Sequence, residues 1–338
     1  MKNYQPKKIL ITGGAGFIGA NYLHYMLNRP NPPMIVNLDA LTYAACLDNL
    51  KNLPHQENYT FIEGNICNKK LVDKILRDYD IDTIIHFAAE SHVDRSISGP
   101  AEFIQTNYIG TFTLLEAARQ YFLDEKHYTE DQCLFHHIST DEVFGSLGPN
   151  DPPFRENMSY EPNSPYSASK AGTDHLVRAY YQTYHLPVTT SNCSNNYGPF
   201  QHQEKFIPTV INACVHNHII PVYGDGTNIR DWLYVEDHCR GIEKIVTTGK
   251  RGETYNIGGN NEWSNINIAK KICEIVDKLY PGKQPYAKLM QFVKDRPGHD
   301  WRYAIDSSKI QHDLNWEPEE TFETGIQKTI EYYLNRWT

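Results

Sequence analysis

The sequence predicts an α/β protein with a doubly wound parallel sheet and a smaller α/β lobe in its C-terminal part. Short apolar runs rich in β-branched residues alternate with helix-like segments through the first half of the chain. A glycine-rich loop follows the first of these runs, and Pro and Gly become frequent after residue 195. Because helices cover both faces of a parallel sheet, its strands appear as continuous apolar runs, which is the pattern found here.

The expected elements follow from these runs in chain order. Strands are expected at residues 8–12, 34–39, 59–64, 82–89, 133–139 and 187–193. Helices are expected at 17–28, near 46–52, near 68–78, near 100–120 and at 165–184, and after residue 195 near 206–216, 236–247, 265–280 and 320–336. We therefore expect a main domain over residues 1–195, to which a strand and a helix return near 233–260, and a lobe that occupies most of residues 196–338.

The composition is that of an ordinary globular protein, with 40% hydrophobic and 22% charged residues among 338. A formal net charge of −9 argues against a nucleic-acid or membrane-surface partner, since neither would meet a basic field. Seven cysteines without a C-x-x-C pair and fifteen histidines without a ligand constellation predict no disulfide framework and no metal. The basic N-terminus leads into a strand-like run without the apolar core of a signal peptide, and no apolar stretch is long enough to span a membrane, so we expect a cytoplasmic protein.

The loop "TGGAGFIG", residues 12–19, lies between an expected strand and an expected helix. Its Gly14, Gly16 and Gly19 match G-x-G-x-x-G, in which glycines allow a tight turn and bring backbone amides to a pyrophosphate. The second strand ends at Asp39, twenty residues after Gly19, where a carboxylate binds ribose hydroxyls. No arginine follows that would receive a 2′-phosphate, so the loop predicts a Rossmann-type domain that binds NAD rather than NADP. A glycine-rich turn in an unrelated α/β protein is the alternative.

The stretch "SPYSASKAG" places Tyr166 and Lys170 one helical turn apart at the start of an expected helix. An ammonium group beside a phenol favours the phenolate, so Lys170 is expected to lower the pKa of Tyr166 toward the working pH. A tyrosinate beside a nicotinamide is a base for a sugar or alcohol hydroxyl. Tyr-x-x-x-Lys alone would be interpreted as an exposed surface pair; the dinucleotide loop and the preceding Ser139–Thr140 favour a catalytic pair.

The motifs "TGGAGFIG", "ISTDEVFG" and "YSASK" together resemble those of the extended short-chain dehydrogenase/reductase family. The likeness narrows to nucleotide-sugar enzymes through "FAAESHVDRSI" (87–97), "SNNYGP" (194–199), "PVYGDGTNIRDWLYVEDH" (221–238) and "RPGHDWRYAID" (296–306). It points to 4,6-dehydratases, because members that only epimerise or decarboxylate generally lack the Thr-Asp-Glu triplet. The resemblance implies NAD as cofactor, dTDP-glucose as substrate, an NAD-binding domain followed by a sugar-nucleotide lobe, and a homodimer formed through a four-helix bundle of the helices near 100–120 and 165–184.

The resemblance also implies the catalytic residues Thr140, Asp141, Glu142, Tyr166 and Lys170. Tyr166, assisted by Thr140, would remove the proton of the hydroxyl on sugar carbon 4 while hydride passes to NAD. Glu142 would then remove the proton on carbon 5 as Asp141 protonates the hydroxyl leaving carbon 6, before hydride returns to carbon 6. Two adjacent carboxyl groups supply the one protonated and one ionised acid that elimination needs. Because successive strand side chains point to opposite faces, both can face one sugar only just past the strand end; without the resemblance, "DE" would be a polar strand-to-loop junction.

The binding residues are expected by the same resemblance. Cofactor contacts are expected at Gly13, Gly16, Phe17, Ile18, Gly19, Asp39, Ala40, Leu41, Thr42, Asn65, Ile66, Phe87, Ala88, Ala89, Glu90, Ser91, Thr106, Tyr166, Lys170 and Asn196. Substrate contacts are expected at Ser91, Thr140, Asn195, Lys205, Phe206, Pro221, Val222, Tyr223, Arg230, Asn265, Arg296, His299 and Asp300. Arg230 and Arg296 are the candidates for a diphosphate, because a guanidinium group binds phosphate oxygens in pairs. Asn65 and Trp301 depart from the family's pattern, which commonly has an aspartate and an arginine there.

Three alternatives stay open at this point: a nucleotide-sugar 4-epimerase, a UDP-sugar 4,6-dehydratase, and a non-catalytic NAD-sensing protein on the same fold. The Asp141–Glu142 pair argues against the epimerase, and the presence of both Tyr166 and Lys170 argues against the sensor. The choice between thymine and uracil depends on a few pocket contacts that the sequence does not identify.

Overall fold

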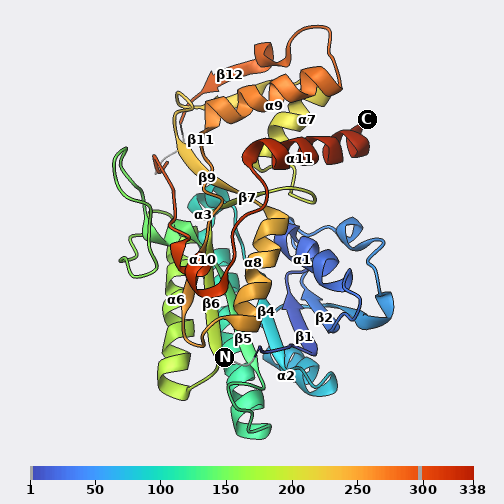
Figure 1. Ribbon diagram of the computed structural model, residues 1–338, viewed down its shortest axis with the longest axis vertical. Coiled ribbons are helices and arrows are strands. Elements are labelled where there is room, and N and C mark those ends of the chain that lie inside the picture. Colours follow the sequence, from blue (N-terminus) through green and yellow to red (C-terminus); the bar gives the residue numbers. More distant parts are fainter. Residues whose placement is uncertain (1–2, 296–298) are drawn as a thin grey trace.

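The computed structural model describes residues 3–295 and 299–338 and centres on a seven-stranded sheet (Figure 1). The strand order is β10-β6-β5-β4-β1-β2-β3, and all neighbouring strands are parallel. The strands are β1 (Lys8–Thr12), β2 (Met34–Asp39), β3 (Tyr59–Glu63), β4 (Thr83–His86), β5 (Leu134–Thr140), β6 (Val188–Cys193) and β10 (Thr254–Ile257). The order reverses between β1 and β4, and ligands of such sheets bind at this point, beyond the carboxyl ends of the strands.

Helices cover both faces of the sheet. α1 (Phe17–Leu27), α8 (Val235–Thr248) and α10 (Ser308–Leu314) share one core with Ile9 and Ile11 of β1. α2 (Lys69–Asp78), α5 (Gly110–Ala118) and α6 (Pro165–Tyr184) share the other core with Leu10. The alternation of side chains along β1 therefore supplies both cores, as a strand buried on both faces requires.

Shorter helical segments connect these elements. The chain after β4 forms α3 (Val93–Ser98) and then one helical run made of α4 (Pro100–Phe103), the π-helical η3 (Ile104–Ile109), α5 and the π-helical η4 (Arg119–Glu125). The 3-10 segments are η1 (Leu47–Leu50), η2 (Gln56–Asn58), η5 (Asp141–Phe144) and η6 (Tyr286–Leu289).

The C-terminal part builds a second core above the main sheet in Figure 1. Its helices are α7 (Phe206–His216), α9 (Asn265–Leu279) and α11 (Phe322–Trp337). Its strands form a three-stranded sheet of β7 (Asn195–Tyr197), β9 (Ile229–Tyr234) and β11 (Glu262–Ser264), and a two-stranded sheet of β8 (Ile220–Tyr223) and β12 (Met290–Val293). The chain also returns to the main domain, since β10 pairs with β6 and α8 packs on α1.

The predicted fold class is confirmed, and all six strands expected in the first half are present. Two elements were wrong in extent. The helix expected near 46–52 is one 3-10 turn, Leu47–Leu50, because the segment is tied to the glycine loop: Cys46 N and Asn49 Nδ2 both donate to Ala15 O, at 3.0 and 3.2 Å. The strand expected at 82–89 ends at His86, because the chain then leaves the sheet to form the wall of a cavity.

Leu10 tests the sheet core, because its side chain is fully buried between β1 and the helices of one face. Leu10→Ala should lower the free energy of unfolding by about 2–5 kcal/mol, through lost transfer energy and a residual cavity. Urea denaturation measures this, with Leu47→Ala as control at a side chain that is 51% exposed. A loss no larger than the control's would contradict the packing described here.

Candidate active site

Two adjoining cavities lie beyond the carboxyl ends of the strands, with volumes of about 310 Å³ and about 270 Å³. Ser91, Glu142, Asn195, Asn196, Gln201 and Lys205 line both. Glu142 follows β5, whereas the segment 195–205 leads from the main sheet into the C-terminal core. The two cavities therefore meet where the main domain and the second core meet.

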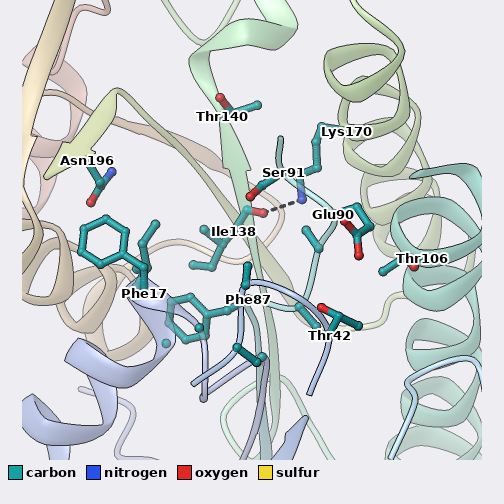
Figure 2. A pocket seen from close by; sticks show the side chains of 18 of the residues that line it. Phe17, Thr42, Phe87, Glu90, Ser91, Thr106, Ile138, Thr140, Lys170 and Asn196 are labelled. Carbon is teal, nitrogen blue, oxygen red and sulfur yellow. Dashed lines mark hydrogen bonds between the residues drawn. The ribbon is translucent and has the colours of Figure 1, made fainter. Parts of the chain in front are cut away.

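The first cavity brings together most of the residues expected at the cofactor (Figure 2). They are Gly13, Gly16, Phe17, Ile18, Gly19, Asp39, Ala40, Thr42, Asn65, Ile66, Phe87, Ala88, Ala89, Glu90, Ser91, Thr106 and Asn196. All five residues expected in catalysis, Thr140, Asp141, Glu142, Tyr166 and Lys170, line the same cavity. Segments far apart in sequence thus converge on one space.

The glycine loop forms one end of this cavity. Gly13 has a φ of +76°, and a Cβ there would stand 2.6 Å from the backbone nitrogen of Ala88. α1 begins after the N-cap Gly16, which has no side chain to cap the first amide groups of the helix. Exposed amides at a helix N-terminus bind phosphate oxygens, so this loop fits the pyrophosphate of a dinucleotide.

Asp39 is held at the end of β2 by two backbone amides. Its Oδ2 accepts from Ala15 N and its Oδ1 from Leu41 N, both at 2.8 Å. Burial raises the pKa of this carboxyl, and the two amides oppose the rise. Each carboxylate oxygen keeps an acceptor site, so Asp39 fits the two hydroxyls of a ribose.

Lys170 is fixed by the way α6 begins. Ser164 and Ser167 form a capping box, and Pro165 occupies the first helical position. The start of the helix is therefore fixed just before Tyr166, and Lys170 follows one turn later. Lys170 Nζ donates to the carbonyl oxygen of Ile138 at 2.7 Å (Figure 2). Burial lowers the pKa of Lys170 to about 8.

Tyr166 does not have the lowered pKa that the sequence predicted. Burial raises its pKa well above the ordinary value, and the charge of Glu142 raises it further. The hydrogen bond of the phenol with the Thr140 hydroxyl opposes the rise. The prediction was wrong because the Lys170 ammonium is directed to the Ile138 carbonyl, while the phenol faces a carboxylate that the Tyr-x-x-x-Lys pattern does not contain.

The acidic pair lies just past the strand end, as predicted. β5 ends at Thr140, and η5 begins at Asp141. Thr140 caps the turn by accepting from Glu142 N at 3.3 Å, and Gly145, with a φ of +94°, ends it. A Cβ at Gly145 would stand 2.6 Å from the Glu161 carbonyl oxygen. The turn lets two successive carboxyl groups line one cavity.

The environment of Asp141 favours its protonated form. The side chain is 2% exposed, and burial raises its pKa well above the ordinary value, with the charge of Glu142 as the next cause. Arg230 and the Thr140 hydroxyl oppose the rise. An ionised carboxylate in this position would be desolvated next to a second anion, so the pair holds one proton and one negative charge.

The second cavity brings together most of the residues expected at the substrate. They are Ser91, Asn195, Lys205, Phe206, Pro221, Tyr223, Arg230, Asn265 and His299, and Thr140 lines the first cavity. Arg230 stacks over Tyr303, 4.3 Å from the ring centroid, and its Nη2 donates to Asp300 O at 3.0 Å. Lys205 Nζ donates to Ser91 O at 3.0 Å, and both residues line both cavities.

Three expected residues that the structure describes do not line these cavities. Val222 is 3% exposed, because the alternation of β8 turns it away from the side of Pro221 and Tyr223. Leu41 contributes its amide to Asp39, and Asp300 accepts from Asn163 Nδ2 at 2.8 Å and from Tyr303. Arg296 lies outside the described residues.

Sequence analysis missed several residues that line the cavities. They include Ile138, Ser139, Cys193, Gln201 and His202 in the first, His92, Glu204, Trp232 and Tyr303 in the second. Ser139 and Tyr303 lie within the quoted motifs "ISTDEVFG" and "RPGHDWRYAID", and Glu204 is the neighbour of the expected Lys205, which is the signal that could have found them. Trp232 also lies within a quoted stretch, residues 221–238, whereas Gln201 lies in none of the motifs that were singled out.

Over residues 3–295 and 299–338, no three His, Cys, Asp or Glu side chains gather in a way that could hold a metal ion. Within the same ranges, no helix has the length and apolarity needed to cross a membrane.

Comparison with known proteins places the chain among nucleotide-sugar enzymes. Residues 10–329 match the family described as GDP-mannose 4,6 dehydratase. A dTDP-glucose 4,6-dehydratase of Escherichia coli is 52% identical over 97% of this chain and 94% of its own. Crystal structures of the dTDP-glucose 4,6-dehydratases of Bacillus anthracis, in complex with NAD, and Streptomyces venezuelae, with NAD and TYD bound, superpose with TM-scores of 0.86 and 0.87. They are 43% and 40% identical, and each comparison covers 97% of both chains.

Gly13→Ala should abolish cofactor binding, because the added methyl group would collide with Ala88 N in a backbone conformation that alanine rarely adopts. Bound NAD is measured by absorbance and by release from the denatured protein. Gly99→Ala is the matched control, since a Cβ there meets only Arg95 O at 3.7 Å. Full NAD content in Gly13→Ala would contradict the role given to the loop.

Proposed function

The chain belongs to the dTDP-glucose 4,6-dehydratase family, and we infer that it is an NAD-dependent hydro-lyase that converts dTDP-glucose to dTDP-4-keto-6-deoxyglucose. The reaction oxidises sugar carbon 4, eliminates water across carbons 5 and 6, and reduces carbon 6. NAD, when bound, takes up a hydride from carbon 4 and returns it to carbon 6, so the overall reaction is redox-neutral. The observation that supports this function most directly is the buried Asp141 beside Glu142 at the meeting of the two cavities.

The acidic pair supplies the acid and the base of the elimination. Asp141 holds a proton because it is buried next to Glu142, and it donates this proton to the hydroxyl leaving carbon 6. Glu142 takes the proton from carbon 5, which the ketone at carbon 4 has acidified. The negative charge passes from Glu142 to Asp141, so the pair carries a single charge before and after the step. During the elimination itself, the buried site therefore does not have to hold two carboxylate charges.

Tyr166 handles the proton of the carbon 4 hydroxyl. The Thr140 hydroxyl forms a hydrogen bond with the phenol, and Lys170 lies one turn further along α6. Because Glu142 raises the pKa of Tyr166, the phenol holds its proton more weakly once Glu142 is itself protonated. The protonation states of Tyr166 and of the acidic pair are thus linked through Glu142.

The second cavity fits a nucleoside diphosphate. Lys205, Arg230 and His299 bring basic groups to its wall in a chain of net charge −9, and Phe206 and Tyr223 offer apolar surface to a base. Phosphate oxygens pair with guanidinium and ammonium groups, and aromatic faces pack on nucleobases. The substrate roles of these residues, and of Arg296, stay proposals.

We further propose that the chain forms a homodimer through the helices near 100–120 and 165–184. Ile104, Tyr108, Ile109 and Phe112 are all at least 36% exposed, and their spacing puts them on one side of the helical run. A partner helix pair would cover them. The cytoplasmic location stays a prediction.

The alternatives explain less of the site. A 4-epimerase reaction does not eliminate water and leaves Asp141 and Glu142 without a task. A non-catalytic NAD-sensing protein would have no need of a lysine kept in a fully buried position. A UDP-sugar 4,6-dehydratase differs only in the base, so the assay below separates it.

One assay tests the function and the base together. The purified protein is incubated separately with dTDP-glucose and with UDP-glucose, and the alkali-induced absorbance of a 4-keto-6-deoxy product is followed. Product from dTDP-glucose, faster than from UDP-glucose, is expected. No product from either would contradict the function, and preference for UDP-glucose would contradict the substrate.

Asp141→Asn and Glu142→Gln should each slow product formation by about 10²–10⁴-fold, the contribution of a positioned acid or base. Oxidation at carbon 4 should survive at least in part, because Tyr166 and Lys170 are unchanged. NADH absorbance on mixing with substrate follows the oxidation, and alkali-induced absorbance follows the product. Glu130→Gln/Asp131→Asn, at an exposed acidic pair, is the control and should match the wild type. Wild-type product rates in both active-site variants would refute their roles.

A further inference from the structure

A buried polar network lies next to Lys170, and its two central residues line neither cavity. It contains His137 of β5 and Asp174 of α6, whose side chains are 0% and 5% exposed. Neither residue is among those that line the two cavities. Any effect on the reaction must therefore pass through a residue that does line them.

The contacts of the network lead to Lys170. His137 Nε2 lies 3.2 Å from Asp174 Oδ1 and 3.5 Å from Lys170 Nζ. The hydroxyl of Ser139 donates to Asp174 Oδ2 at 2.8 Å, and the hydroxyl of Tyr160 also hydrogen-bonds this carboxyl. Asp174 follows Lys170 by one helical turn, so both side chains leave α6 on the same face.

Lys170 and Asp174 each stabilise the charge of the other. Burial lowers the pKa of Lys170 to about 8, and the negative charge of Asp174 is the largest effect that opposes this shift. Burial raises the pKa of Asp174 to about 6, and the positive charge of Lys170 is the largest effect that opposes this rise. Between these two values Lys170 is protonated and Asp174 ionised, so both charges are present at neutral pH.

The other titratable groups nearby are uncharged. His137 and His86 are fully buried, and burial holds the pKa of each well below its ordinary value. Burial raises the pKa of Cys193, on β6, to about 12, so its thiol stays protonated. On the side of Asp174, Tyr160 has a pKa raised by burial, and His175 acts on the carboxyl from the same helix. Within the described residues, Asp174 is thus the carboxylate whose charge acts on Lys170.

We propose that Asp174, with His137 as a neutral spacer, is a positioning residue of the dehydratase reaction that keeps Lys170 protonated inside the protein. This inference rests on the proposed function. Lys170 lines the first cavity with the other residues expected in catalysis, and a fully buried ammonium group without a counter-charge releases its proton. Ser139 and Tyr160 hold the carboxylate in its ionised form from the opposite side.

The test is the pH profile of product formation by Asp174→Asn in the full chain with bound NAD. The Lys170 charge is present below its pKa and is lost as pH rises through about 8 in the wild type. Without the Asp174 charge the loss occurs at lower pH, so the alkaline limb should move down by about one pH unit or more. Asp174→Glu should restore it in part.

The control separates this effect from damage to the helix. Val177→Ala removes a buried side chain of the same helix and no charge. It should lower stability and leave the alkaline limb in place. An unmoved limb in Asp174→Asn would overturn the inference, whereas a wild type without dehydratase activity would overturn the proposed function instead.

A stability measurement covers the case in which Asp174→Asn does not fold. Lys170→Met leaves Asp174 as an unpaired buried charge, and Asp174→Asn leaves Lys170 unpaired. The double variant Lys170→Met/Asp174→Asn removes both charges, so its thermal midpoint should exceed that of either single variant. A double variant less stable than both would contradict the pairing.

Discussion

The burial of Asp141 is the constraint on which the rest of the site depends. A carboxyl group that is 2% exposed and adjoins a second carboxyl group cannot be ionised together with it at low cost. The 3-10 turn at the end of β5 creates this situation, because it keeps Asp141 and Glu142 on one cavity instead of on opposite faces of a strand. The site consequently holds one proton and one negative charge, which are what an elimination consumes and regenerates.

Tyr166 is buried in the folded chain, and its surroundings set its protonation. Burial raises its pKa, and the charge of Glu142 raises it further from the cavity side. The protonation states of Tyr166 and of the acidic pair are therefore linked through Glu142.

The parts of the site that could be predicted from the sequence are those fixed by local geometry. The glycine loop, Asp39 and the Tyr166/Lys170 pair depend on spacings within one loop or one helical turn, and the structure brings all of them to the first cavity. Residues that the C-terminal part brings to the second cavity were missed, as with Trp232 and Gln201. Val222 was expected to contact the substrate, but its side chain is buried and lines neither cavity. The pKa of Tyr166 was predicted with the wrong sign, because the burial of the phenol and the approach of Glu142 are both properties of the folded chain. The acidic pair was predicted in part. The resemblance to the family predicted its catalytic role, and the alternation of strand side chains predicted that it lies just past the end of β5.

The protonation state of Asp141 tests the central claim most directly. Infrared difference spectra between the wild type and Asp141→Asn, recorded across the pH range, separate the carbonyl stretch of a carboxylic acid from the bands of a carboxylate. We expect the acid band of Asp141 to persist at neutral pH, because burial and the Glu142 charge raise its pKa. Carboxylate bands for Asp141 at neutral pH, with no acid band, would contradict the account.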